Sequence, residues 1–120
     1  MRWVLKDKSF KFAVRIVKLY KYMCDEKKEF ILSKQVLRSG TSIGAMIREA
    51  EYSESHSDYI HKMAIAQKEI NETLYWLELL AETEYISNNE FESINNDAIE
   101  IIKMVTSSIK TAKSTLNTKH

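Results

Sequence analysis

The most constraining stretch of this sequence is QVLRSGTSIGAMIREA, residues 35–50. It contains both glycines of the chain, Gly40 and Gly44, inside a run that otherwise reads as helix. A glycine in a helix interior costs roughly 0.5–1 kcal/mol relative to alanine. A spacing of four residues places both glycines on one face, where the missing side chains let a neighbouring helix approach. We therefore predict unusually close helix packing at Gly40 and Gly44.

The composition of the whole chain favours a few long helices. Its 120 residues include no proline and only two glycines, so helix breakers are almost absent. We expect a single all-α domain over residues 1–120, with helices at about residues 8–25, 33–51, 56–83 and 88–113. Short connections between these helices predict an antiparallel, up-down-up-down four-helix bundle.

Local signals mark where several of these helices begin. Ser87 and Glu90 have the spacing of a capping box, and Ser55 and Asp58 form a looser version of it. The first helix is expected to open near Asp7 or Ser9. Residues 114–120 are expected to fray.

The sequence predicts a cytoplasmic protein that does not enter membranes. Its first ten residues include several charges and do not resemble a signal peptide. No apolar run approaches the roughly 20 residues that span a bilayer. The single cysteine, Cys24, excludes an internal disulfide and suits a reducing compartment.

The first and third predicted helices carry more apolar surface than one bundle core can cover. Apolar side chains span about 220° of the first helix, whereas a monomeric bundle needs a stripe of roughly 100° or somewhat more. The expected core stripe of the third helix consists of Tyr59, Met63, Ala66, Ile70, Leu74, Leu77 and Ala81. A second apolar patch lies on its opposite side, and such patches mark interaction surfaces. We therefore predict a homo-oligomer with interface residues Val17, Ile65, Trp76, Leu79 and Leu80.

Charge is strongly segregated along the chain. Residues 1–48 carry a net charge of +8, residues 49–100 a net charge of −11, and residues 101–120 a net charge of +4. Basic and acidic helices could pair within the bundle or between subunits, or one segment could face a charged partner. An acidic region of this size would suit a basic protein partner.

One row of basic residues is a candidate surface for RNA or DNA. Lys8, Lys11, Arg15 and Lys18 share one face of the first predicted helix. Contacts to phosphates need only such charge, and an oligomer would repeat the row in each subunit. The alternative is a solvated helix face without a partner.

No constellation of catalytic or metal-binding residues is evident. Di-metal sites in helical bundles use two Glu-x-x-His motifs with two further glutamates, and only Asp58-x-x-His61 comes near. Cys24 has no histidine close in sequence and is expected to be a small core residue. We expect no catalytic residues, no metal and no cofactor.

Charged residues of the second and third helices could still form a network. These residues are Arg38, Arg48, Glu49, Glu69, Glu72 and Glu78. Partly buried ion pairs that fix how the two helices pack are one interpretation, and a ligand-binding pocket is the other.

The segments described above resemble the bacterial four-helix bundle family also called 23S ribosomal RNA intervening-sequence proteins. The resemblance covers about residues 6–113. It rests most heavily on Gln35-x-Leu37-Arg38-Ser39-Gly40-Thr41-Ser42-Ile43-Gly44-Ala45 followed by Glu49-Ala50, and further on Lys8-Ser9-Phe10, Phe12-Ala13 and Tyr75-Trp76-Leu77-Glu78-Leu79-Leu80. The family usually places asparagine after Gly44-Ala45, where this chain has Met46.

The resemblance implies a closed bundle that assembles as a homopentamer around a central channel. Some genes of the family lie within an intervening sequence of the large ribosomal RNA. A related, notably basic branch serves diversity-generating retroelements as an accessory protein that binds nucleic acid and a reverse transcriptase. No biochemical activity is established for the family at large. We therefore predict a non-catalytic homo-oligomer, pentameric if it follows the family, that associates with RNA or DNA; the alternative is a protein-interaction scaffold that uses residues 49–100.

Overall fold

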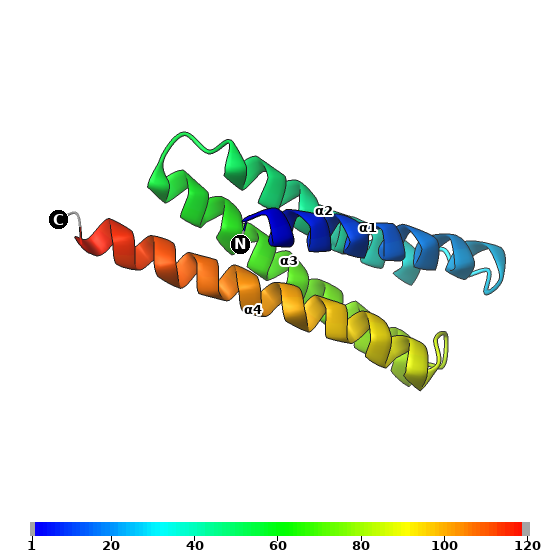
Figure 1. The fold of residues 1–120 in the computed structure, drawn as a ribbon. Helices are drawn as coiled ribbons and strands as arrows, with labels where there is room; N and C mark the ends of the chain where they lie inside the picture. The colour runs from blue at the N-terminus through cyan, green and yellow to red at the C-terminus, as the bar shows by residue number, and fades with distance from the viewer. Residues whose placement is uncertain (1, 119–120) are drawn as a thin grey trace.

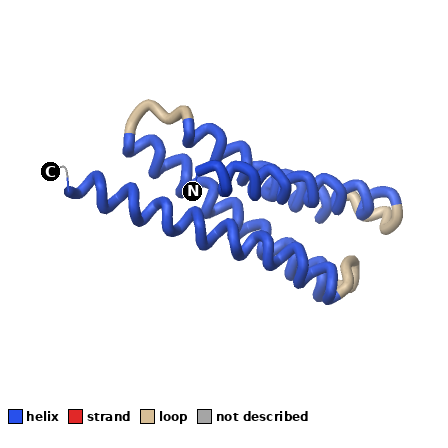
Figure 2. Tube along the Cα trace, viewed as in Figure 1, coloured by secondary structure: helices blue, strands red, loops and turns tan. Residues whose placement is uncertain are grey.

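Four helices joined by short loops make up the described chain (Figures 1 and 2). The computed structural model describes the backbone of residues 2–118 and the side chains of residues 4–115. The helices are α1 (Arg2–Asp25), α2 (Leu32–Glu51), α3 (His56–Glu82) and α4 (Asn88–Thr118). No strand occurs in this range, so the all-α prediction is confirmed. No helix in the described range combines the length and apolarity that crossing a bilayer requires.

The four helices surround one core. α1 packs against α2, α2 against α3, α3 against α4, and α4 against α1, with the α1–α4 seam the least extensive. Figure 1 shows the connections at residues 26–31 and 83–87 at one end of the molecule and the connection at residues 52–55 at the other. The result is an elongated body of 54 × 22 × 21 Å.

Two helices are longer than the sequence predicted. α1 begins at Arg2 rather than near residue 8, and α4 ends at Thr118 rather than near residue 113. Leu5 is buried and extends the apolar stripe of α1 by one more repeat, and its packing on the core stabilises the additional turns of this helix. Ser9 does not cap α1; its hydroxyl donates to the carbonyl oxygen of Lys6 at 3.0 Å within the helix.

Capping side chains fix the starts of α3 and α4. The backbone N–H of Asp58 donates to Ser55 Oγ at 3.0 Å, and the N–H of Glu54 donates to Asp58 Oδ2 at 3.2 Å. At α4 the N–H of Glu90 donates to Ser87 Oγ at 3.1 Å, and the N–H of Ser87 donates to Glu90 Oε1 at 2.9 Å. Both predicted capping sites are confirmed, and they satisfy backbone donors that a helix start leaves free.

The start of α2 uses a carboxylate that the sequence did not single out. Glu29 accepts hydrogen bonds from the backbone N–H groups of Ile31 (3.2 Å), Leu32 (3.0 Å) and Ser33 (2.8 Å). Partial burial raises the pKa of Glu29, but the three backbone donors and the Ser33 hydroxyl outweigh it, so the net shift is downward. Glu29 therefore caps α2 in its charged form.

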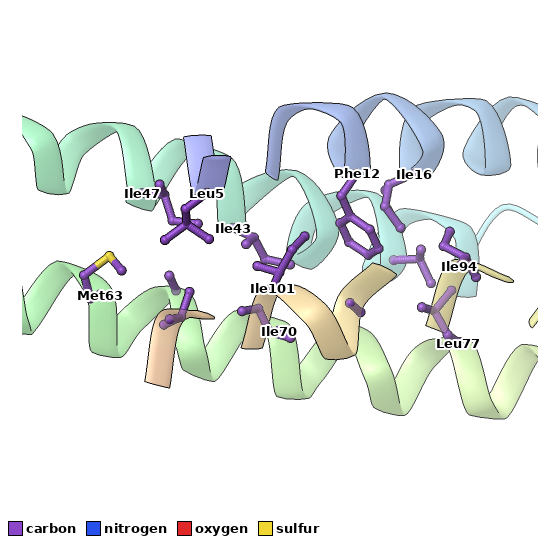
Figure 3. Close-up of a cluster of buried hydrophobic side chains, with 14 of the residues drawn as sticks. Leu5, Phe12, Ile16, Ile43, Ile47, Met63, Ile70, Leu77, Ile94 and Ile101 are labelled. Atoms are coloured by element: carbon purple, nitrogen blue, oxygen red, sulfur yellow. The ribbon is translucent and has the colours of Figure 1, made fainter. Parts of the chain in front are cut away.

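The core draws side chains from all four helices (Figure 3). The residues labelled there are Leu5, Phe12, Ile16, Ile43, Ile47, Met63, Ile70, Leu77, Ile94 and Ile101. They belong to one buried apolar cluster, as expected for a single small domain.

The buried stripe of α3 differs from the predicted one. It consists of Met63, Ala66, Ile70, Thr73, Leu77 and Leu80. Tyr59, Leu74 and Ala81, the other members of the predicted stripe, are half-buried and pack against the core from the edge of this stripe. Spacings that alternate between three and four residues keep one face of α3 toward the core over its whole length. Thr73 is accepted there because its hydroxyl hydrogen-bonds with the Ser39 hydroxyl at 2.9 Å and with the Glu69 carbonyl oxygen at 2.8 Å.

Candidate functional site

Gly40 and Gly44 both face α1. A Cβ atom added to Gly40 would lie 2.7 Å from Cγ1 and 2.8 Å from Cγ2 of Ile16, which is fully buried. At Gly44 the added atom would lie 3.3 Å from the carbonyl oxygen of Ser9. The structure thus places α1 against the bare backbone of α2, side chain to backbone at one glycine and backbone to backbone at the other.

The predicted basic row lies on the side of α1 that faces α4, and most of it is paired. Lys8 Nζ lies 2.8 Å from Glu100 Oε1, and Arg15 contacts Asp97 Oδ2 at 2.6 Å and Ser93 Oγ at 3.1 Å. The hydrogen bond and charge of Glu100 raise the pKa of Lys8. Part of the positive charge of residues 1–48 is therefore neutralised within the bundle by ion pairs between α1 and α4.

The other two residues of the row differ from each other. Lys11 pairs with Asp7 at 3.0 Å on the same helix. Lys18 is exposed and forms no ion pair within the described residues. Three of the four candidate phosphate contacts consequently already hold a carboxylate, which reduces the positive field that this row presents.

Unpaired cations gather further along the chain. Lys18, Lys21, Lys28 and Lys34 are exposed and make no ion pair in the part of the chain that the structure describes. They follow the second half of α1, the connection after it and the first turn of α2. We call this group the lysine end; sequence reasoning passed over three of its members because they do not fall on one helical face.

An apolar strip runs along the outside of α1. It consists of Phe10, Val14 and Val17, of which Phe10 is 56% and Val14 38% exposed, while Val17 is half-buried. The guanidinium carbon of Arg48 lies 5.9 Å from the centre of the Phe10 ring. We call these three residues the α1 strip.

A groove of about 400 Å³ between α1 and α2 adjoins the α1 strip. Its walls include Phe10, Ala13, Thr41, Gly44 and Ala45, so small side chains on both helices leave it open. Its lining is mostly apolar. The groove extends the apolar surface of α1 across to α2.

The predicted interface residues of α3 are less exposed to solvent than Phe10 and Val14 of the α1 strip. Ile65, Trp76 and Leu79 are half-buried, and the indole N–H of Trp76 donates to Glu72 Oε2 at 3.1 Å. Leu80 has no exposed surface, so assigning it to an oligomer interface was wrong. The alternating stripe of α3 places Leu80 in the core of the bundle.

The six charged residues considered for a network do not converge on one pocket. Arg38 contacts Glu69 at 3.5 Å and also pairs with Glu72. Glu49 instead lies 3.8 Å from Lys62 Nζ, and Arg48 covers Phe10. These separate contacts join α2 to α3 and α1, which agrees with the structural interpretation rather than with a ligand site.

Residues that could hold a metal are dispersed. Within residues 2–118, no three His, Cys, Asp or Glu side chains are grouped closely enough to bind an ion. Cys24 is half-buried rather than in the core, with its sulfur 3.8 Å from Ser33 Oγ. His56 Nε2 lies 2.8 Å from the carbonyl oxygen of Ala112, while His61 is exposed.

These features define an all-helical bundle protein whose prominent surfaces are an apolar strip and a cluster of lysines. The family model described as 23S rRNA-intervening sequence protein matches residues 3–107. The chain belongs to this family, as the sequence resemblance predicted.

A solved structure supports the same assignment. The chain is similar to a protein of unknown function from the S23 ribosomal protein family of Bacteroides thetaiotaomicron, with 62% sequence identity and a TM-score of 0.90. The match covers 92% of this chain and 99% of that one. No curated protein matches the chain.

Proposed function

We propose that this chain is the subunit of a non-catalytic homo-oligomer of antiparallel, up-down-up-down bundles, and that the α1 strip is its main contact face. The carrying observation is the exposure of Phe10 and Val14 side by side on one helix. Removing apolar surface from water stabilises a contact by roughly 25 cal/mol per Å², so a continuous strip favours association. Cys24, the lone cysteine, suits the cytoplasmic location that belongs to this proposal.

A closed ring needs two different surfaces on each subunit. Contacts between unlike surfaces close into rings, and the pentamer implied by the family resemblance is a ring of this kind. The half-buried group of Ile65, Trp76 and Leu79 on α3 is the second surface in our proposal. It lies on a different helix from the α1 strip and retains apolar area that its own subunit does not cover.

Light scattering on the purified protein at micromolar concentration tests the assembly. The native chain should give a multiple of its 14.0 kDa subunit mass. A variant with Phe10→Glu and Val14→Glu should shift to smaller species because it places charges in the contact. Phe30→Glu with Ile31→Glu is the matched control, since Phe30 is 52% and Ile31 76% exposed in the connection before α2.

Two results would contradict the proposal. A native chain that stays a 14 kDa particle would remove the oligomer. An unchanged mass for the Phe10→Glu, Val14→Glu variant would remove the α1 strip as its contact face. Circular dichroism of both variants shows whether the helices are retained.

A second candidate function, association with RNA or DNA, is favoured by the lysine end. Its four side chains are free of carboxylates in the described structure, and an oligomer repeats them in every subunit. Phosphate contacts need charge and reach but no base reading. The family description, which refers to 23S rRNA, makes ribosomal RNA the first target to test.

Titration with a ribosomal RNA fragment at several salt concentrations tests this candidate. The logarithm of affinity should fall with the logarithm of salt, by about 0.7 per contact on single strands. Lys21→Glu with Lys34→Glu should weaken binding uniformly across RNA sequences. Lys68→Glu with Lys110→Glu, at exposed sites on α3 and α4, is the charge-matched control. Absence of binding at low salt, or equal losses in both variants, would exclude the lysine end.

A further inference from the structure

We infer that the cavity beside the α2–α3 connection binds a polyhydroxylated amine, the chemistry of an amino sugar, in each subunit. This cavity measures about 470 Å³, within the range typical of small-ligand sites, roughly 300–1,000 Å³. None of its lining residues belongs to the α1 strip, to the apolar group on α3 or to the lysine end. The inferred role therefore goes beyond self-association and nucleic-acid contact.

The cavity lies where the ends of three helices meet. Its walls come from the last turn of α2, the connection after it, the first turns of α3 and the last turns of α4. Figure 1 shows the α2–α3 connection and the end of α4 at the same end of the molecule. No described side chain of α1 lines the cavity, and the buried residues of its lining are Ala50 and Ala112. This end of the bundle is therefore open because one helix is missing from the wall and the core side chains there are small.

The charges of the lining favour a cation. Among the described side chains, Glu51 and Glu54 line the cavity, and no lysine or arginine does. Lys6 pairs with Glu51 at 3.7 Å, whereas Glu54 is exposed and forms no ion pair within the described residues. Lys110 and Lys113 lie outside the lining, and Lys110 faces a different groove along α4. Glu54 is therefore a carboxylate whose charge is left for a ligand.

The helix ends add to the preference for a cation. α2 and α4 both end at the cavity, and the C-terminal end of a helix carries a partial negative charge that stabilises cations. α3 begins there, but Asp58 in its first turn offsets the partial positive charge of that helix start. Outside the lining, Glu49 and Asp58 share one partner, Lys62, at 3.8 and 3.7 Å. An ammonium group placed in the cavity is therefore favoured by both side chains and backbone.

The hydroxyl groups of the walls favour a ligand that carries hydroxyls as well. Ser55 Oγ is occupied by the backbone N–H of Asp58, at 3.0 Å. The Thr115 hydroxyl donates to the carbonyl oxygen of Thr111, also at 3.0 Å. Four other lining hydroxyls form no hydrogen bond within the described residues, namely those of Ser53, Ser107, Ser108 and Thr111. Each of them can both donate and accept, which matches a ligand hydroxyl better than a simple amine. Tyr59 adds an aromatic wall on which an ammonium group can pack.

Amide NMR titration of the full chain with glucosamine, glucose and methylamine tests the inference, at a pH below the pKa of the glucosamine amine. Glucosamine should shift the signals of Ser53, Glu54 and Ser108 in a saturable way. Glucose has a hydroxyl in place of the ammonium and should bind about two- to five-fold more weakly, as for loss of one exposed ion pair. Methylamine has the charge without the hydroxyls and should bind about ten-fold or more weakly than glucosamine.

Three single substitutions separate charge from hydroxyl contacts. Glu54→Gln should weaken glucosamine about two- to five-fold and leave glucose unchanged. Glu49→Gln, a nearby acid outside the lining, is the matched control and should leave both unchanged. Ser108→Ala should weaken both sugars about two- to ten-fold, because each loses one hydrogen bond. The Phe10→Glu, Val14→Glu variant should bind glucosamine normally, so failure of this inference and failure of the assembly proposal can be told apart.

Four outcomes would overturn the inference. No saturable shift with glucosamine at any soluble concentration would remove the site. Equal affinities for glucosamine and methylamine would show that the hydroxyls of the walls recognise nothing. Equal losses in Glu54→Gln and Glu49→Gln would reduce the effect to general charge. A response of the same signals to Mg²⁺ but not to glucosamine would indicate a metal site instead.

Discussion

At the level of single residues, Gly40 shows how a missing side chain positions a helix. Its neighbour Ile16 is β-branched, fully buried and surrounded by core residues, so it has little freedom to turn away. Gly44 faces a backbone carbonyl oxygen at a less crowded distance. Two glycines on the same face therefore tolerate a methyl group differently.

Gly40→Ala should lower the free energy of unfolding. The added methyl would overlap Ile16, and overpacking of a core costs about 1–3 kcal/mol. The better helix propensity of alanine offsets about 1 kcal/mol of this cost at most. Gly44→Ala should lose less than Gly40→Ala because its contact is looser. Urea unfolding at one fixed protein concentration compares them. A Gly40→Ala protein as stable as the native chain would show that Ile16 can move.

Residue-level prediction from sequence worked where the signal was local. The spacing of Gly40 and Gly44 was visible directly, and both do face a neighbouring helix. The core position of Thr73 was not visible, since its partner Ser39 comes from another helix. Leu80 was misassigned for a related reason: the second apolar side of α3 was counted around the helix without knowing which residues its neighbours would cover.

At the level of secondary structure, helix starts were predictable only when the capping residue directly precedes the helix. Ser55 with Asp58 and Ser87 with Glu90 follow a fixed spacing and were found. Glu29 was missed because it reaches α2 from a connection in which Lys28 adopts φ 54°. The left-handed backbone at Lys28 reverses the chain direction, so that the Glu29 carboxylate reaches the N–H groups at the start of α2. No simple sequence spacing predicts a cap of this kind.

Glu29→Gln should lower the free energy of unfolding at neutral pH and make that free energy less dependent on pH in the acidic range. The folded pKa of Glu29 is lowered, so its contribution is complete above the unfolded pKa of about 4.5 and is lost as pH falls through the folded value. The variant should lose about 1 kcal/mol near pH 7, as for loss of a helix cap. Native and variant stabilities should converge toward pH 3.

Urea unfolding at pH 7, 5 and 3 measures this convergence. Glu26→Gln is the control, because Glu26 is an exposed carboxylate in the same connection. An equal pH response in the native protein and in Glu29→Gln would mean that the carboxylate charge does not contribute to the cap.

At the level of the whole molecule, the bundle class followed from composition, while the use of each helix face did not. Absence of proline and regular apolar spacing leave few alternatives to long packed helices. The sequence showed surplus apolar surface and a basic row on α1 but could not show that the row faces α4. Only the folded arrangement separates α1 into a face paired by charge, a face packed on glycine and an exposed apolar strip.

These whole-molecule features predict opposite responses to salt. The native particle mass from light scattering should persist at about 1 M salt, because an apolar contact is not screened, whereas association with RNA should be lost. Dissociation of the native particle at high salt would indicate that ion pairs rather than the α1 strip hold the assembly together.

The contact between Gly40 and Ile16 also couples the substitutions that these two positions can accept during evolution. A substitution that adds a methyl group at position 40 requires a smaller side chain at position 16, because either change alone destabilises the core. Divergence in this part of the bundle should accordingly proceed by paired exchange, with the combined volume of the two sites held nearly constant.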